Sequence, residues 1–264
     1  FVMLTNGQAE QARKTFEAYL DDARRNGCRL LMSAEVAFAM ADTIVPALPT
    51  DAFHVVSFVR HPMDALASHY NQGIKRNASR GTLEQIAKVV VSMPSVPSSL
   101  TGVALFDWLR HCGHERMTVL PYVEGGRPVN TPGRLAAALG VTLEEDAARP
   151  VNASYTPAAV KFKLLVNHLP PPLLAAVDAE LDVAVQAYSD LPRRRSQGLA
   201  EWVTPETLAG LEARFRDNVD RLQAEFGSAI VSRETIDSPL PSEAAVDSID
   251  AVWAHVRATG ALAM

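Results

Sequence analysis

Residues 54–72 read HVVSFVRHPMDALASHYNQ and join a strand signal to a helix signal. The run from His54 to Val59 is rich in β-branched and aromatic residues, which is typical of a strand buried on both faces. Pro62 has no backbone N–H to leave unsatisfied, so it favours the first position of a helix that runs to about Lys75. The stretch therefore predicts a strand, a short turn and a helix.

Strand and helix signals alternate on both sides of this stretch as far as Leu139. Further strands are predicted at Arg29–Ser33 and Arg116–Leu120, and only helical patterns follow Thr156. Such alternation predicts a three-layer α/β fold with a parallel sheet and a helical C-terminal half. The helices are expected at Gln8–Asn26, Glu35–Val45, Thr82–Met93, Leu100–His111, Thr131–Leu139, Thr156–His168, Pro172–Tyr188, Thr204–Phe226 and Ser242–Thr259.

Three strands are few, because a typical sheet has ~5–6. The sequence begins with Phe1 rather than Met, and we expect a first strand to lie upstream of it.

The composition limits the classes of function. The 264 residues are 48% hydrophobic, which suits one domain over residues 1–264. A formal net charge of −5 argues against a nucleic-acid partner. No stretch approaches ~18 consecutive apolar residues, so no membrane span is expected. Cys28 and Cys112 show no metal spacing, and we expect no metal and a cytoplasmic location, with a targeting segment upstream of Phe1 left open.

The residues around Pro62 can form an anion site. Arg60 follows the predicted strand, where open α/β sheets place their ligand crevice. The free N–H groups and the dipole of the helix that starts at Pro62 favour an anion, and Ser68 adds a hydroxyl. The alternative is structural: Arg60 pairs with Asp64, and Ser68 is a small packed residue.

The same segment resembles the 3′-phosphate-binding motif of sulfotransferases that use 3′-phosphoadenosine 5′-phosphosulfate (PAPS). In that family a strand ends in Arg, a Pro follows two residues later, then an acidic residue, and a Ser stands eight positions after the Arg. The Ser-x-Tyr-x-Gln continuation occurs in carbohydrate-acting members. The matching residues are Arg60, Pro62, Asp64, Ser68, Tyr70 and Gln72.

The resemblance extends more weakly over residues 29–226 and implies a P-loop nucleotide-binding type of sheet. Its further segments are Met32-Ser-Ala-Glu35, Leu120-Pro-Tyr-Val and Val151-Asn-Ala-Ser154. It implies that Arg60 and Ser68 bind the 3′-phosphate of PAPS, the co-substrate, and that Asn152 and Ser154 reach the nucleotide. Capping of a helix by Thr156 is the alternative for that last segment.

The resemblance also implies a catalytic base near the end of the strand before the motif strand. Glu35 is the candidate, since general-base catalysis requires a group that takes the proton of the acceptor. The alternative for Glu35 is an acid in the first turn of a helix, where the dipole stabilises it. The expected acceptor is a hydroxyl, or an amine, on a glycan, a lipid or a small metabolite.

The chain departs from the family at one point. Sulfotransferases carry a Lys-containing loop for the 5′-phosphosulfate after their first strand, and the only early glycine, Gly7, has no Lys beside it. We expect the loop to lie upstream of Phe1, so that the chain as it stands is incomplete for catalysis. The alternatives are a degenerate, non-catalytic member that binds a nucleotide or a partner, and a nucleoside or nucleotide kinase.

Overall fold

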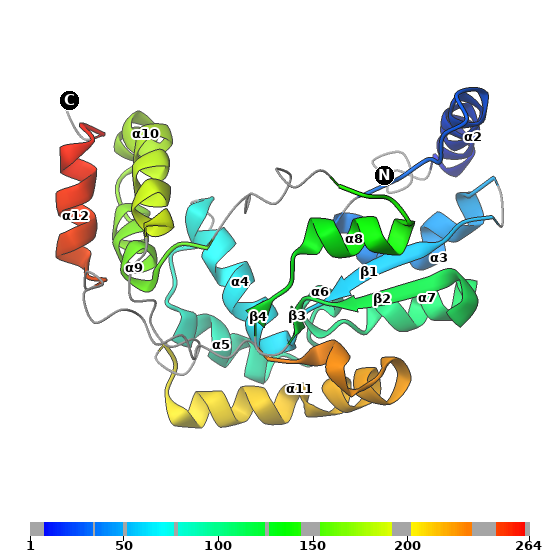
Figure 1. Cartoon of the computed structure of the whole chain (residues 1–264). Coiled ribbons are helices and arrows are strands. Elements are labelled where there is room, and N and C mark those ends of the chain that lie inside the picture. Colours follow the sequence, from blue (N-terminus) through cyan, green and yellow to red (C-terminus); the bar gives the residue numbers. More distant parts are fainter. Residues whose placement is uncertain are drawn as a thin grey trace.

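The parallel sheet consists of two strands, β1 (Val55–Val59) and β2 (Met117–Pro121), in a chain that is otherwise mostly helical (Figure 1). The register pairs Val55 with Met117 and Val59 with Pro121. The computed structural model describes residues 8–33, 35–49, 52–76, 79–124, 127–143, 154–191, 202–233 and 247–261.

The expected three-layer parallel sheet of the P-loop type is therefore wrong. Residues 29–33 form no strand, and Leu31 is 58% exposed. An apolar run becomes a buried strand only where a neighbouring strand pairs its backbone and other layers cover its side chains. With β2 as its partner in the described sheet, β1 is an edge strand, and Val59 is its one buried residue.

The crossover from β1 to β2 is made of helices. It contains α4 (Pro62–Lys75), α5 (Leu83–Ser92), α6 (Ser98–Thr101) and α7 (Ala104–Cys112), followed by the 3₁₀ turn η3 (His114–Arg116). The single helix expected at Leu100–His111 is broken, because Gly102 ends α6 in the left-handed region with φ +74°.

The N-terminal elements pack beside α7. They are α2 (Ala9–Arg25), η1 (Glu35–Ala39), α3 (Ala41–Ile44) and η2 (Val45–Ala47), so the helix expected at Glu35–Val45 is split into shorter pieces. Trp108 donates a hydrogen bond of 2.9 Å to the carbonyl of Phe38 and so joins α7 to η1. After β2 come the short antiparallel strands β3 (Val123–Glu124) and β4 (Arg127–Pro128), and then α8 (Thr131–Leu139).

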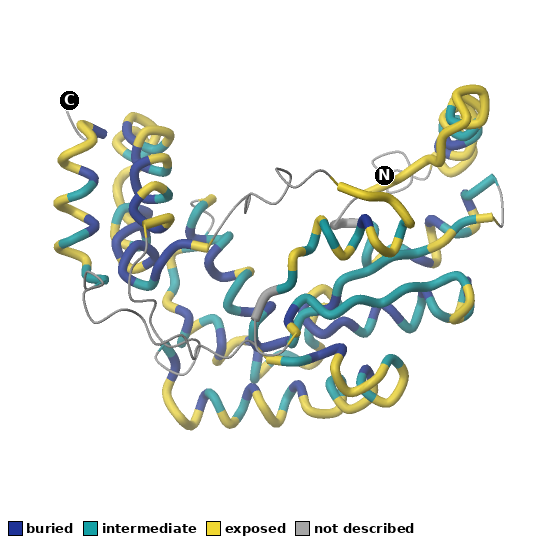
Figure 2. The backbone as a smooth tube through the Cα atoms, viewed as in Figure 1, coloured by how far each residue is buried: buried dark blue, intermediate teal, exposed yellow. Residues whose placement is uncertain are grey.

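The C-terminal elements are helical, as the periodicity predicts. They are α9 (Pro157–Val166), α10 (Pro171–Asp190), α11 (Pro205–Phe226), η6 (Ser228–Val231) and α12 (Ile249–Ala258). In Figure 1, α9, α10 and α12 gather at one end of the molecule, away from the sheet. The largest core is shared by α4, α5, α9, α10, α11 and α12, and dark buried segments mark it in Figure 2. Among the described helices, none has the length and apolar character that a membrane span requires.

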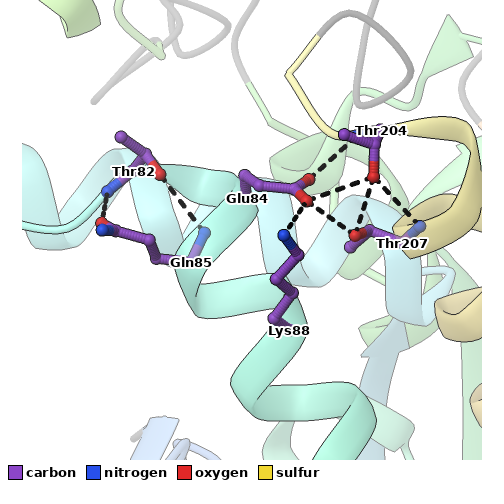
Figure 3. Close-up of polar contacts among 6 residues, drawn as sticks. All are labelled: Thr82, Glu84, Gln85, Lys88, Thr204 and Thr207. Atoms are coloured by element: carbon purple, nitrogen blue, oxygen red, sulfur yellow. Dashed lines mark hydrogen bonds and ion pairs between the residues drawn. The ribbon is translucent and has the colours of Figure 1, made fainter.

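Glu84 fixes the start of α11 to α5 (Figure 3). Its carboxylate accepts hydrogen bonds from the Thr204 amide at 2.8 Å and from the Thr207 hydroxyl at 2.7 Å. Lys88 lies 2.9 Å from the same carboxylate. The hydrogen bond from Lys88, followed by those from Thr204 and Thr207, lowers the pKa of Glu84 to about 2.

We predict that Glu84→Gln lowers the melting temperature by a few degrees at pH 6, because an amide cannot accept all of these bonds. The folded-state pKa of about 2 lies below the ordinary value of 4.5, so the carboxylate contributes its full stability above pH 4.5. The difference between wild type and variant should shrink as the pH falls from 4.5 toward 2. Calorimetry over this pH range measures it. Glu206→Gln, in the exposed first turn of α11, is the matched control, and equal losses in both variants would contradict the role of Glu84.

Candidate functional site

The junction between β1 and α4 is fixed from both sides by backbone hydrogen bonds. The Tyr122 amide donates to the carbonyl of Val59 at 2.7 Å, directly after the last pair of the β1–β2 ladder. His61 caps α4, because its Nδ1 accepts from the Met63 amide at 3.2 Å. Arg60, between Val59 and His61, therefore leaves the sheet at a defined point.

Arg60 is half-buried and stacks on an aromatic ring. Its guanidinium carbon lies 3.6 Å from the centroid of the Tyr122 ring. Stacking of this kind contributes ~0.5–2 kcal/mol and uses the face of the guanidinium, so the N–H groups at its edge remain available. No carboxylate in the described ranges forms an ion pair with Arg60. Asp64, the alternative partner, instead lies 4.0 Å from Arg233.

Two further groups set the electrostatics of the junction. Burial, and then the positive charge of Arg233, lower the pKa of His61 to about 4. His61 is therefore neutral near pH 7, as its acceptor role toward Met63 requires. Arg60 brings positive charge to the start of α4, where the helix dipole is also positive, whereas Arg233 lies 4.0 Å from the carboxylates of Asp64 and Glu212.

Ser68 lies on α4, half-buried, ~9 Å along the helix axis from Pro62. Its hydroxyl makes no hydrogen bond with any residue that the structure describes, Arg60 included. Arg60 and Ser68 therefore belong to one strand–helix unit and form no hydrogen bond with each other.

Asn71 ties the loop before α9 to α4, a contact that the sequence did not reveal. Its amide donates to the Tyr155 carbonyl at 3.2 Å and accepts from the Tyr155 amide at 3.2 Å, and both residues are buried. This double hydrogen bond places exposed Ser154 against α4, less than one turn beyond Ser68. Asn152 lies outside the described residues. Thr156 caps α9 by accepting from the Ala159 amide, so capping is confirmed.

Glu35 begins η1 rather than following a strand, because residues 29–33 form none. Its side chain lies outside the described residues, so its role as a base stays a prediction. Phe38, later in η1, packs against the cluster that contains Val59 and Leu105. The element that carries Glu35 thus lies near the end of β1.

Tyr122, Asn71 and Arg233 are the residues of the site that sequence reasoning missed. Tyr122 stands in the Leu120-Pro-Tyr-Val segment, but nothing there shows that its ring meets Arg60. Asn71 lies inside the motif helix without matching the motif. Within the described ranges, no three His, Cys, Asp or Glu side chains gather as metal ligands would.

Comparisons with family models, curated proteins and solved structures give no match to this chain.

We predict that Asn71→Ala destabilises the protein by about 2–4 kcal/mol, because it leaves two buried backbone groups of Tyr155 without partners, at ~1–3 kcal/mol each. Urea unfolding measures this loss. His69→Ala, an exposed neighbour on the same helix, is the control and should change the stability little. A loss in Asn71→Ala no larger than in the control would mean that the double hydrogen bond does not hold the loop.

Proposed function

We propose that the β1–α4 junction binds the 3′-phosphate of PAPS, or of its desulfated product, and that the protein is a PAPS-dependent sulfotransferase. One observation carries the proposal: the Arg60 guanidinium, at the start of α4, stacks on Tyr122 and has no carboxylate partner in the described part of the chain. A half-buried cation without a carboxylate partner is stabilised most by a bound anion. The motif of residues 60–72 supports a phosphate as that anion.

The charge of Arg60 and the dipole of α4 support an anion at the junction. α4 has 14 residues, and the dipole of the helix favours an anion at this end, where Pro62 has no N–H and the Met63 amide donates to His61. Arg60 offers a planar fork of donors, which suits phosphate oxygens. Arg233 is close enough to His61 to lower the pKa of that ring, but the carboxylates of Asp64 and Glu212 at 4.0 Å offset its charge. An anion at this junction contacts only the β1–α4 unit, so its binding does not require a large sheet.

We assign Ser68 and Ser154 as further contacts to the nucleotide, because one lies on α4 and the other lies beside it. Ser68 has a hydroxyl that no described residue engages, on the helix that Arg60 precedes. Ser154 is exposed and held beside that helix by the bond between Asn71 and Tyr155. Asn152 is assigned by the resemblance alone.

The proposed reaction moves a sulfuryl group to a hydroxyl or amine of a glycan, a lipid or a small metabolite. The acceptor atom forms a bond to sulfur while the bond from sulfur to the oxygen of the 5′-phosphate breaks. Like phosphoryl transfer, this step depends on positioning and on neutralising the leaving phosphate. We assign Glu35 as the base that takes the acceptor's proton.

Nucleotide binding without transfer is the second candidate. It is favoured by the fact that no Lys-containing Ser/Thr/Gly turn follows a strand in the described residues. An assay of sulfuryl transfer from PAPS separates the two candidates.

We predict that Arg60→Ala weakens binding of adenosine 3′,5′-bisphosphate by about 10- to 150-fold, because a charge-assisted contact contributes ~1.5–3 kcal/mol. Adenosine 5′-monophosphate, which lacks the 3′-phosphate, should bind both forms equally. Calorimetric titration of both ligands measures the effect, and exposed Arg216→Ala on α11 is the control. Equal losses for the two nucleotides would show that Arg60 does not bind the 3′-phosphate.

We predict that Glu35→Gln lowers the turnover of sulfuryl transfer by ~10²-fold or more, while the affinity for adenosine 3′,5′-bisphosphate stays nearly the same. An amide of similar size cannot take the acceptor's proton. Glu180→Gln, exposed on α10, is the control and should leave turnover intact. Unchanged turnover in Glu35→Gln would assign Glu35 to the structural role at a helix start.

A further inference from the structure

Tyr122 is fixed through both of its backbone polar groups at the point where β2 ends. Its amide donates to the carbonyl of Val59 at 2.7 Å, and its carbonyl accepts from the Val129 amide at 2.9 Å. The next residue, Val123, is 1% exposed and pairs with Pro128 in the β3–β4 ladder. The backbone that carries the Tyr122 ring therefore has little freedom to move, because moving it would break two hydrogen bonds.

The Tyr122 ring covers one face of the Arg60 guanidinium. The guanidinium carbon lies 3.6 Å from the ring centroid, and both side chains are half-buried. An arginine side chain has many rotamers when it is free in solvent, and a guanidinium that stacks on a ring keeps few of them. The ring therefore limits the directions in which the N–H edge of Arg60 can point.

A carboxylate would hold Arg60 in a different way. It would bond to the N–H edge, cancel the positive charge and so compete with a bound anion. No carboxylate in the described ranges pairs with Arg60, and Asp64, in the first turn of α4, lies 4.0 Å from Arg233 instead. The ring thus orients the cation and leaves its charge and its N–H donors for a ligand.

We propose that Tyr122 is the positioning residue of the β1–α4 junction: its ring holds the Arg60 guanidinium, before a ligand arrives, in the orientation that binds the phosphate. This inference rests on the proposed function, because it names the residue through which Arg60 is made ready for that ligand. Ordering Arg60 in the free protein reduces the entropy that is lost on binding. The ring therefore strengthens binding without contacting the ligand.

The ring of Tyr122, rather than its hydroxyl, has this role. The hydroxyl makes no hydrogen bond with any residue in the described part of the chain, whereas the ring makes the stacking contact. Phenylalanine has the same ring face and lacks the hydroxyl. Leucine is apolar but has no π face for a cation. The variants Tyr122→Phe and Tyr122→Leu therefore separate the two groups.

Calorimetric titration of the full chain with adenosine 3′,5′-bisphosphate tests this role. Tyr122→Leu should weaken binding by about 3- to 30-fold, and Tyr122→Phe by no more than about twofold, because only the first variant loses the cation–π contact. Adenosine 5′-monophosphate should bind the wild type and both variants equally. Tyr19→Leu, at a position 58% exposed on α2, is the control and should change neither affinity.

Three results would overturn the proposal. They are equal losses in Tyr122→Phe and Tyr122→Leu, full affinity in Tyr122→Leu, and a matching loss of adenosine 5′-monophosphate. Melting curves show whether each variant is folded. Tyr122→Met, a second variant without an aromatic ring, takes the place of Tyr122→Leu if the leucine variant is not folded.

A double variant shows whether Tyr122 acts through Arg60. In the Arg60→Ala background, Tyr122→Leu should cause no further loss of affinity for the bisphosphate, since the ring then has no guanidinium to orient. A residue that contacted the ligand directly, or that only stabilised the fold, would add its own loss in that background. Additive losses would therefore contradict a positioning role.

NMR of the ligand-free protein tests the stacking itself. The Nε–H signal of Arg60 is identified by its absence in Arg60→Lys. In the wild type and in Tyr122→Phe, the ring should shift this signal and restrict its motion on the picosecond-to-nanosecond timescale. Both effects should disappear in Tyr122→Leu, and a signal that Tyr122→Leu leaves unchanged would contradict the proposal.

The failure of this inference is distinguishable from that of the proposed function. Binding of adenosine 3′,5′-bisphosphate that depends on Arg60 but not on an aromatic ring at position 122 would reject the positioning role alone. A wild-type protein that does not bind adenosine 3′,5′-bisphosphate would reject the proposed function, and the positioning role with it, even where the Arg60 signal depends on the ring.

Discussion

The hydrogen bond from the Tyr122 amide to the Val59 carbonyl, at 2.7 Å, sets the geometry on which the β1–α4 junction depends. In a parallel ladder a carbonyl accepts from the residue after its register partner, so the Val59 carbonyl, paired with Pro121, takes the amide of Tyr122, directly after β2. This bond brings the Tyr122 ring to the place where Arg60 leaves β1. The cation is therefore held at the strand end by an aromatic face rather than by a carboxylate, and its charge is not cancelled within the described structure.

Local chemistry made several helix boundaries predictable. α4 runs from Pro62 to Lys75 and α8 runs from Thr131 to Leu139, as expected, because a cap or a proline starts each helix and a left-handed Gly140 ends the second. The two strands of the sheet were predicted close to where they lie, at His54–Val59 and Arg116–Leu120, but the extent of the sheet was not predictable in this way. An apolar run at residues 29–33 has the composition of a strand, but pairing depends on a partner that composition does not reveal, and the segment remains exposed coil.

The residues of the candidate site also fall into those that the local sequence predicts and those that it does not. Arg60 and Ser68 could be predicted because both stand at fixed distances from one proline in a continuous motif. Tyr122 and Arg233 come from distant parts of the chain, and only the fold brings them to the junction. Asn71 has no sequence signal, since a buried asparagine inside a helix is recognised only by its partner, Tyr155.

Tyr155 connects α4 to α10. Its backbone bonds Asn71 on α4, its ring lies under the ammonium of Lys75, and its hydroxyl lies 3.4 Å from the carboxylate of Asp182 on α10. Burial and the nearby negative charge of Asp182 raise the pKa of this hydroxyl, so it remains a donor at neutral pH. Moving the loop would break buried hydrogen bonds at a cost of ~1–3 kcal/mol each. Tyr155 and its loop therefore hold α4 and α10 at a fixed spacing.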